Sequence, residues 1–156
     1  QGELLKQKEY FDILACIRRV TEYVSRIALK SGIRVSVNCS HDTVTMYGNN
    51  ISFMRALFNL IENSIHHMKR SGNVVITVED NENDIMIIYR DDGEGMPEHE
   101  AAMLNGQNGV VWENEKIGRG IGMYLIYQTV AEHGGKVQIK TAEGKGLGVY
   151  MSFPKA

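Results

Sequence analysis

The order in which helical and strand-like hydrophobic patterns follow one another constrains the fold of this chain most strongly. Residues 4–31, 50–70 and 120–133 carry apolar side chains at helical spacing. Alternating or continuous apolar runs lie between and after them, and such runs are typical of strands: 33–37, 44–47, 73–79, 84–90, 136–141 and 147–153. Helices that alternate with groups of strands predict an α/β (α+β) two-layer sandwich. It would be a mixed, mostly antiparallel sheet of about five strands packed on about three helices.

The helical stripes also predict which side chains form the core. The first helix should bury Ile13, Ile17, Val20, Val24 and Ile27. The second should bury Met54, Leu57, Phe58, Ile61, Ile65 and Met68. Asn49 or Asn50 can cap the second helix, because a side-chain amide oxygen accepts from the first unpaired backbone N–H groups. The polar turn at 80–83 predicts a hairpin between the strands on either side of it.

Length and charge limit the classes of partner. The chain has 156 residues, which fits one domain over 1–156, and a net charge of -2. No basic excess favours nucleic acid or an anionic membrane surface, so we expect no nucleic-acid partner and no direct membrane contact. No apolar run approaches the length of about 18 residues that a membrane span needs, and no signal peptide opens the chain. We therefore expect a cytoplasmic location, which does not exclude membrane segments in a longer parent protein.

The second helix carries an unusual polar stripe. Spacings of three and four residues place five polar side chains on one face of the helix: Asn59, Asn63, His66, His67 and Arg70. Glu62 lies beside this face. A solvated face is one interpretation. However, asparagine is a poor helix former, and solvent-facing helices usually use Lys and Glu. Amide oxygens beside a carboxylate suit a hard cation such as Mg²⁺, which keeps phosphate and water ligands.

Two glycine-rich segments form further candidate sites. The strand 84–90 runs into Asp91-Asp92-Gly93-Glu94-Gly95-Met96, where a carboxylate could accept from a ligand amine while the backbone approaches closely. Met96 offers an adaptable apolar wall. A plain turn is the alternative. The segment Gly118-Arg119-Gly120-Ile121-Gly122 opens the last helix and exposes backbone N–H groups to an anion. It matches neither a dinucleotide fingerprint nor a Walker A motif.

These elements, in this order, resemble the ATP-binding (Bergerat-type) domain of the GHKL superfamily, which includes sensor histidine kinases and gyrase-type ATPases. Residues 59–63 resemble the N box, 91–95 the first glycine box and 118–122 the second. Residues 144–146, followed by Leu147, resemble the third. Asn59 favours the histidine kinases, because gyrase-type enzymes usually carry glutamate there.

The resemblance implies a role for each matched residue. Asn63, with Asn59, would ligate Mg²⁺, and Glu62 and Asn59 would act as catalytic residues at the transferring phosphoryl group. Asp91 would hydrogen-bond the adenine amine of ATP. The remaining nucleotide-binding positions would be His66, His67, Gly93, Gly95, Met96, Gly118, Arg119, Gly120, Ile121, Gly122 and Leu147. The segment 98–117, which includes Trp112, would form a lid over the nucleotide.

The implied reaction is transfer of the γ-phosphoryl group of Mg-ATP to a histidine on a separate dimerisation segment, with a response regulator as partner of the full kinase. The chain lacks a histidine in the acceptor context, and residues 1–10 would be a remnant of the connection to that segment. The sequence departs from the family at His66-His67, where Lys-Tyr is usual, and at Leu147, where threonine is common. These changes keep two alternatives open: a degenerate pseudokinase or nucleotide-sensing module, and a serine kinase like those that act on anti-sigma-factor systems.

Overall fold

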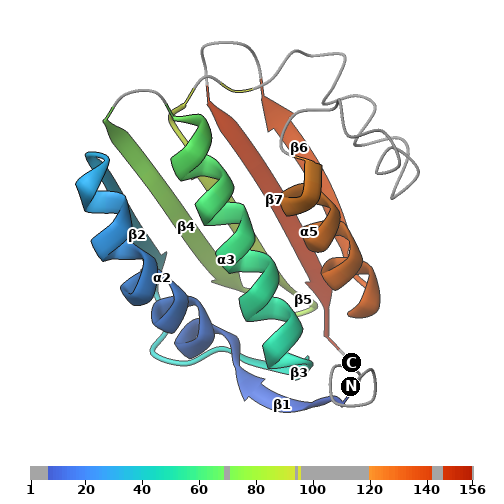
Figure 1. Ribbon diagram of the computed structural model, residues 1–156. Helices are drawn as coiled ribbons and strands as arrows, with labels where there is room; N and C mark the ends of the chain where they lie inside the picture. Colours follow the sequence, from blue (N-terminus) through green and yellow to red (C-terminus); the bar gives the residue numbers. More distant parts are fainter. Residues whose placement is uncertain (1–6, 69–70, 94, 96–119, 142–145, 156) are drawn as a thin grey trace.

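A five-stranded sheet carries three helices on one face in the computed structural model, which describes residues 7–68, 71–93, 95, 120–141 and 146–155 (Figure 1). The strands lie in the order β2-β4-β5-β7-β6. Their bounds are β2 Ile33–Cys39, β4 Gly72–Asp80, β5 Asp84–Asp91, β6 Lys136–Thr141 and β7 Leu147–Pro154. The pair β2–β4 is parallel and the other pairs are antiparallel, so the predicted mixed sheet and two-layer fold are confirmed.

The helices are α2 Ile13–Lys30, α3 Asn50–His67 and α5 Gly120–Glu132. Helix α3 lies between the other two and runs along the middle of the sheet (Figure 1). Asn49 caps it, because its Oδ1 accepts from the backbone N–H of Ser52, which is 3.0 Å away. The cap predicted at Asn49 or Asn50 is therefore confirmed at Asn49. Helix α5 ends before Gly134, whose φ of 71° is readily adopted by glycine.

The predicted helix at 4–31 is wrong for its first described turns. Residues Glu9–Asp12 form strand β1, which pairs antiparallel with β3, Thr45–Gly48, in a second small sheet. Asp12 has extended backbone angles and its Oδ1 accepts from the N–H groups of Leu14 and Ala15, so the helix begins only after it. Asp12 is thus both the last residue of β1 and the N-cap of α2, so the strand ends where the helix begins.

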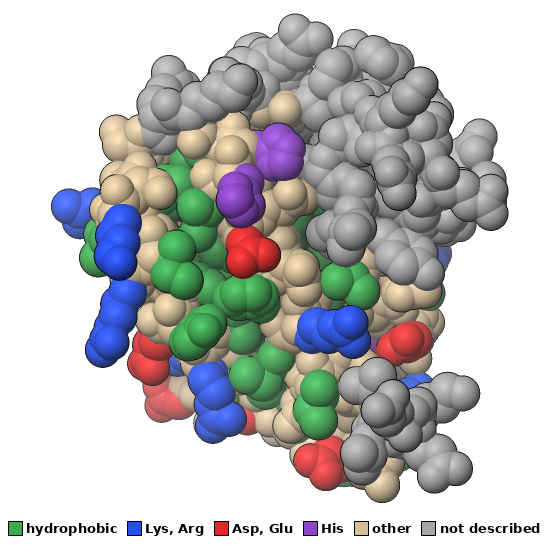
Figure 2. Space-filling view, in the orientation of Figure 1, with side chains coloured by type: hydrophobic (Ala, Val, Ile, Leu, Met, Phe, Trp, Pro, Cys, Tyr) green, Lys and Arg blue, Asp and Glu red, His purple; other side chains and the backbone are tan. Residues whose placement is uncertain are grey.

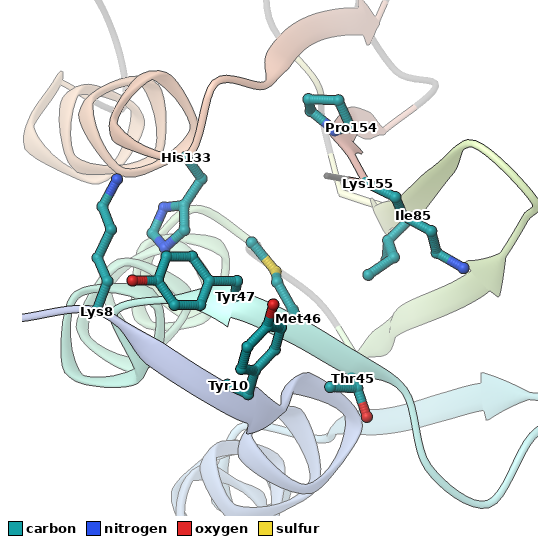
Figure 3. Close-up of a pocket in the computed structure, with 9 residues that line it drawn as sticks. All are labelled: Lys8, Tyr10, Thr45, Met46, Tyr47, Ile85, His133, Pro154 and Lys155. Atoms are coloured by element: carbon teal, nitrogen blue, oxygen red, sulfur yellow. The ribbon is translucent and has the colours of Figure 1, made fainter.

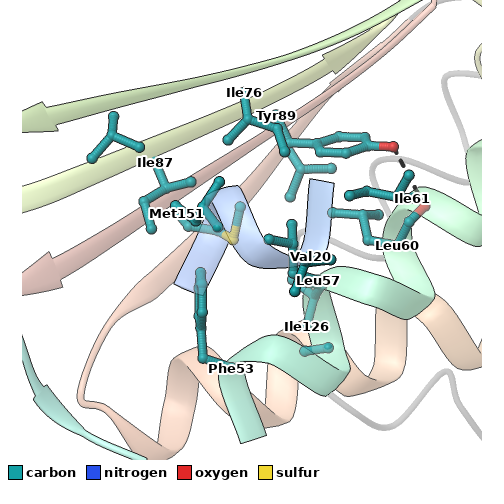
Figure 4. Close-up of a cluster of buried hydrophobic side chains, with 14 of the residues drawn as sticks. Val20, Phe53, Leu57, Leu60, Ile61, Ile76, Ile87, Tyr89, Ile126 and Met151 are labelled. Atoms are coloured by element: carbon teal, nitrogen blue, oxygen red, sulfur yellow. Dashed lines mark hydrogen bonds between the residues drawn. The ribbon is translucent and has the colours of Figure 1, made fainter. Parts of the chain in front are cut away.

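The core lies between α3 and the inner face of the sheet. Figure 4 shows Phe53, Leu57, Leu60 and Ile61 of α3 beside side chains of the central strands, among them Ile76, Ile87, Tyr89 and Met151. All of these side chains are buried. Burial of each large aliphatic side chain contributes about 1.5–3 kcal/mol, so this layer contributes much of the folding free energy.

The predicted core stripes are partly wrong. Ile27 is 49% exposed, and the neighbouring Ala28 takes the buried position on α2. On α3, Leu57, Ile61 and Met68 are buried as predicted, whereas Met54, Phe58 and Ile65 are only half-buried. The fully buried line of α3 is rotated toward Phe53, Ala56, Leu60 and Ser64. The reason is that Phe58 faces α2, where its ring centroid lies 5.8 Å from that of Tyr23, and not the sheet.

Within the described part of the chain, no helix is long and apolar enough to cross a membrane.

Candidate functional site

The carboxylate of Asp91 lies at the end of β5 and is held from several elements at once. Its Oδ1 accepts from the backbone N–H groups of Gly93 and Leu147, each 3.1 Å away. Its Oδ2 accepts from the hydroxyl of Ser64 on α3 at 2.6 Å. Asp91 is 6% exposed, so this is a buried carboxylate whose position is determined by its hydrogen-bond donors.

The register of the sheet explains how these donors meet. Asp91 pairs with Leu147 of β7 and with Val74 of β4, so it is the last residue of a central strand. Tyr89 lies two residues earlier and points to the same face, toward α3. Its hydroxyl lies 3.4 Å from the carbonyl oxygen of Leu60 (Figure 4) and 2.5 Å from Ser64 Oγ. The strand and the helix are therefore joined by a line of hydrogen bonds from Tyr89 to Ser64 to Asp91.

Two glycines lie against Asp91 where a larger residue would be crowded. A Cβ at Gly93 would come within 2.9 Å of Met68 Cγ and 3.3 Å of Asp91 Oδ1. Gly146 has a φ of 80°, and a Cβ there would collide with the carbonyl oxygen of Asp91. Glycine is therefore favoured at position 93 beside the carboxylate and at position 146 beside the backbone of Asp91.

The adjacent Asp92 has a structural role. It is exposed and turns away from the core, where Oδ1 accepts from the backbone N–H of Asn73 at 2.8 Å. Its Oδ2 accepts from the Asn73 side-chain amide at 3.2 Å. These bonds fasten the end of β5 to the start of β4, so the turn that follows Asp91 begins from a fixed position.

The polar stripe of α3 lies on the outer side of the same helix. Glu62, His66 and His67 are exposed, and Asn59 and Asn63 are half-buried. The Asn59 amide donates to the carbonyl oxygen of Arg55 at 2.8 Å, and His67 Nδ1 lies 2.8 Å from the carbonyl oxygen of Asn63. Figure 2 shows histidine and acidic side chains gathered over this part of α3. The predicted Mg²⁺ ligands are thus on one helix, and Asn63 directly precedes the Ser64 that contacts Asp91.

The structure brings together some of the predicted site residues. Asp91, Gly93 and Leu147 are in direct hydrogen-bond contact, and Gly95 is half-buried beside them in sequence. Gly120, Ile121 and Gly122 form the first residues of α5, as predicted. Met96, Gly118 and Arg119 lie outside the described residues, as do Arg70 and the proposed lid at 98–117.

Sequence analysis missed Ser64 and Tyr89. Ser64 lies on the buried side of α3, where a small serine does not by itself indicate a functional role. Tyr89 is one of several apolar residues in β5, so the strand pattern does not single it out. A usable signal exists in retrospect: Tyr89 and Asp91 share one face of β5, and a serine on the covering helix can reach both.

A cavity of about 400 Å³ lies away from Asp91, beside β1 and β3 (Figure 3). The three basic side chains that line it, Lys8, His133 and Lys155, already contact other groups of the same chain. Lys8 Nζ donates to the carbonyl oxygen of Glu132 at 3.0 Å, and Lys155 pairs with Asp80 at 2.5 Å. His133 lies 2.6 Å through Nδ1 from the carbonyl oxygen of Thr129 and accepts through Nε2 from the N–H of Asn49 at 3.0 Å. The chemistry of this cavity is therefore structural, and Asp91 is the better candidate for a ligand site.

Comparison with known proteins places this geometry in a family. The model of histidine kinase-, DNA gyrase B- and HSP90-like ATPases matches residues 48–156. Sporulation kinase A of Bacillus subtilis is 26% identical over 148 residues, which cover 95% of this chain and 24% of that kinase. The sensor protein SrrB of Staphylococcus aureus is 30% identical over 113 residues, which cover 65% of this chain and 18% of that protein. The chain thus spans about a quarter or less of the length of these two relatives.

Solved structures agree with the fold. The catalytic domain of the histidine kinase ThkA matches with a TM-score of 0.81 at 22% identity, over 96% of this chain and 98% of that domain. A ThkA structure in complex with the response regulator protein TrrA matches with a TM-score of 0.74 at 20% identity, over 96% of this chain and 42% of that chain. Together with the family match, they identify this chain as a member of the histidine kinase-, DNA gyrase B- and HSP90-like ATPase family, with the fold of the ATP-binding catalytic domain of a two-component sensor histidine kinase.

Proposed function

We propose that this domain binds Mg-ATP and transfers its γ-phosphoryl group to a histidine on a separate dimerisation segment of a sensor kinase. The observation that carries the proposal is the buried Asp91 carboxylate, held on both oxygens and bordered by glycines. A carboxylate accepts hydrogen bonds and suits the exocyclic amine of adenine. The groups around Asp91 therefore fit a nucleotide base.

The outer face of α3 supplies the groups for the phosphates. Asn63 and Asn59 would hold Mg²⁺ through their amide oxygens, which are ligands that this cation accepts beside phosphate oxygens and water. Bound Mg²⁺ would neutralise the negative charge of the phosphates. Positioning and charge neutralisation account for most of the catalysis in phosphoryl transfer, so few protein groups need to react.

Glu62 is exposed on this face and would act on the acceptor. As the imidazole nitrogen forms a bond to phosphorus, the bond to the leaving ADP oxygen breaks and the imidazole loses its N–H proton. A carboxylate beside the reacting group can take that proton. We propose this role for Glu62, with Asn59 beside it as a second catalytic residue and His66, His67 and the start of α5 facing the phosphates.

No histidine of this chain lies in the sequence context that the family uses for its phosphoryl acceptor. Both ring nitrogens of His133 are engaged, and His67 Nδ1 contacts the Asn63 carbonyl oxygen. The acceptor would therefore come from the dimerisation segment of the parent protein, and a response regulator would receive the phosphoryl group from it. The match to ThkA, which was solved with a response regulator, supports this partner. The proposal also places the domain in the cytoplasm.

Calorimetric titration with ATP, with and without Mg²⁺, tests the nucleotide site. The wild-type chain should bind ATP more tightly with Mg²⁺. Asn63→Ala should lose about tenfold or more of that gain, because a charged metal–ligand contact disappears. Asn38→Ala, at an exposed position on β2, is the matched control and should keep it. Equal binding with and without Mg²⁺ in the wild type would rule out the metal assignment.

Phosphotransfer tests the reaction itself. The chain is mixed with radiolabelled ATP and the separate dimerisation segment of its parent kinase, and Glu62→Gln is compared with wild type. Label on a histidine of the added segment supports the kinase. ATP binding without any transfer would favour the nucleotide-sensing module, and label on a serine of a partner would favour the serine kinase.

A further inference from the structure

Two buried hydroxyl groups lie behind the Asp91 carboxylate. Ser64 and Tyr89 are both 0% exposed, in a contact between α3 and β5 that is otherwise apolar. A matching apolar pair could fill this space without desolvating two hydroxyl groups. Their presence therefore indicates a role beyond packing.

The direction of the hydrogen bonds follows from proton counting. A serine hydroxyl has one proton, and a carboxylate oxygen can only accept. Because Ser64 Oγ lies 2.6 Å from Asp91 Oδ2, its proton goes to Asp91. Tyr89, whose hydroxyl is 2.5 Å from Ser64 Oγ, must then donate to Ser64. The proton of Ser64 is thus committed to the carboxylate, and the phenol holds the serine oxygen from behind.

The geometry points to Ser64 and Tyr89 as positioning residues that make the base site selective for a 6-amino purine. This inference rests on the proposed function, which puts the base amine on Asp91. The hydroxyl of Ser64 is fixed by Asp91 and Tyr89, so it does not turn to donate to a 6-keto oxygen. The N–H groups of Gly93 and Leu147 hold the other carboxylate oxygen. The base therefore meets a fixed acceptor, which attracts an amine and repels a keto oxygen without reorientation on binding.

Binding of two nucleotides that differ only at this position tests the inference. ATP and inosine triphosphate, which carries a keto oxygen in place of the amine, are titrated calorimetrically with Mg²⁺. The wild-type chain should prefer ATP. Ser64→Ala should lower the affinity for ATP about tenfold, because Asp91 loses one charge-assisted hydrogen bond. The affinity for inosine triphosphate should change little. Tyr89→Phe removes the phenol that holds the Ser64 oxygen from behind, so it should lower ATP affinity by a smaller factor, again with little change in the affinity for inosine triphosphate.

Stability controls separate positioning from packing. Ser64→Ala leaves the Tyr89 hydroxyl with the Leu60 carbonyl oxygen 3.4 Å away, so it should lower the unfolding midpoint. The double variant Ser64→Ala/Tyr89→Phe removes both hydroxyl groups and should recover the midpoint while the base preference stays low. Tyr127→Phe removes a buried phenol oxygen from α5 and should keep the preference of the wild type.

The outcomes distinguish the two proposals. A folded wild-type chain that binds neither nucleotide would overturn the proposed function and this inference with it. Binding of ATP by the wild type, with the same preference for ATP in Ser64→Ala, Tyr89→Phe and the double variant, would overturn the inference alone.

Discussion

Asp12 and Asp91 are carboxylates at opposite ends of the domain (Figure 1), and they collect their hydrogen-bond donors differently. Asp12 accepts from the backbone N–H groups of Leu14, Ala15 and Val44 at 3.0, 3.3 and 3.0 Å, and all three bonds end on Oδ1. Asp91 accepts on both oxygens, and one of its donors is a side-chain hydroxyl backed by a phenol. The first arrangement caps a helix and joins a loop to it.

The difference teaches how a capping carboxylate can be told from a site carboxylate. Backbone donors on a single oxygen can be satisfied equally well by an amide or carboxylate oxygen. Donors on both oxygens require a carboxylate, because the amide of asparagine has only one acceptor oxygen. The same substitution at the two positions should therefore have very different effects.

The largest expected effect is that of Asp91→Asn on nucleotide binding. In either orientation, the NH₂ group of the asparagine faces the Ser64 hydroxyl or the N–H groups of Gly93 and Leu147. Two hydrogen-bond donors then face each other without an acceptor between them. We expect ATP affinity to fall on the order of a hundredfold, from the loss of a charge-assisted bond and an unsatisfied buried group. Titration with ATP measures this. Asp12→Asn is the control, and a similar loss there would contradict the comparison.

Gly146→Ala should have the next largest effect, on stability. The alanine would need a φ of 80°, and its Cβ would collide with the Asp91 carbonyl oxygen. We expect a loss of about 2–3 kcal/mol in the free energy of unfolding, measured by denaturant titration. Gly134→Ala is matched in φ at 71°, but its Cβ would lie 3.9 Å from Pro154 Cγ, so it should lose only about 1 kcal/mol. Equal losses at both positions would show that conformation alone, and not the approach to Asp91, determines the effect.

Asp12→Ala should reduce stability and leave the nucleotide site intact. Removing the cap of α2 and the acceptor for Val44 should decrease the free energy of unfolding by about 1–2 kcal/mol. ATP affinity should match that of the wild type, because Asp12 is at the other end of the domain. Denaturant and ATP titrations of one protein sample measure both quantities, and a coupled loss of affinity would mean that the two ends are not independent.

The smallest expected effect is a pH dependence from a buried phenol. Burial raises the pKa of Tyr127 to about 12, from an ordinary value of 10.0. As pH rises through this window, the unfolded chain releases the proton while the folded chain keeps it, so stability should fall between these values. The stability of Tyr127→Phe should decline less steeply with pH. Thermal unfolding at a series of alkaline pH values measures this decline. An unchanged slope would assign the decline to other groups.

The sequence predicted the fold because periodicity and turn residues determine it here. Asp91 was recognisable as a strand-end carboxylate before two glycines, and Asn49 as a cap. The start of α2 was missed because the apolar spacing runs on past Asp12, although the pairing of β1 with β3 overrides it. Ser64 was missed because its role depends on which side chains β5 presents to α3. Such contacts follow from tertiary packing and not from local pattern. The roles of Asn59, Asn63 and Glu62 in the reaction stay predictions.

The donors around Asp91 are far apart along the chain. Ser64 precedes it by 27 residues and Leu147 follows it by 56. During synthesis, a nascent chain that has passed residue 91 has the carboxylate and Ser64, but it must wait for β7 before Leu147 can contribute its N–H group. Ribosomes add about 5–20 residues each second, so the set of donors to Asp91 stays incomplete for several seconds. A ligand that needs the complete set of donors around Asp91 would therefore bind only after β7 has been added to the sheet.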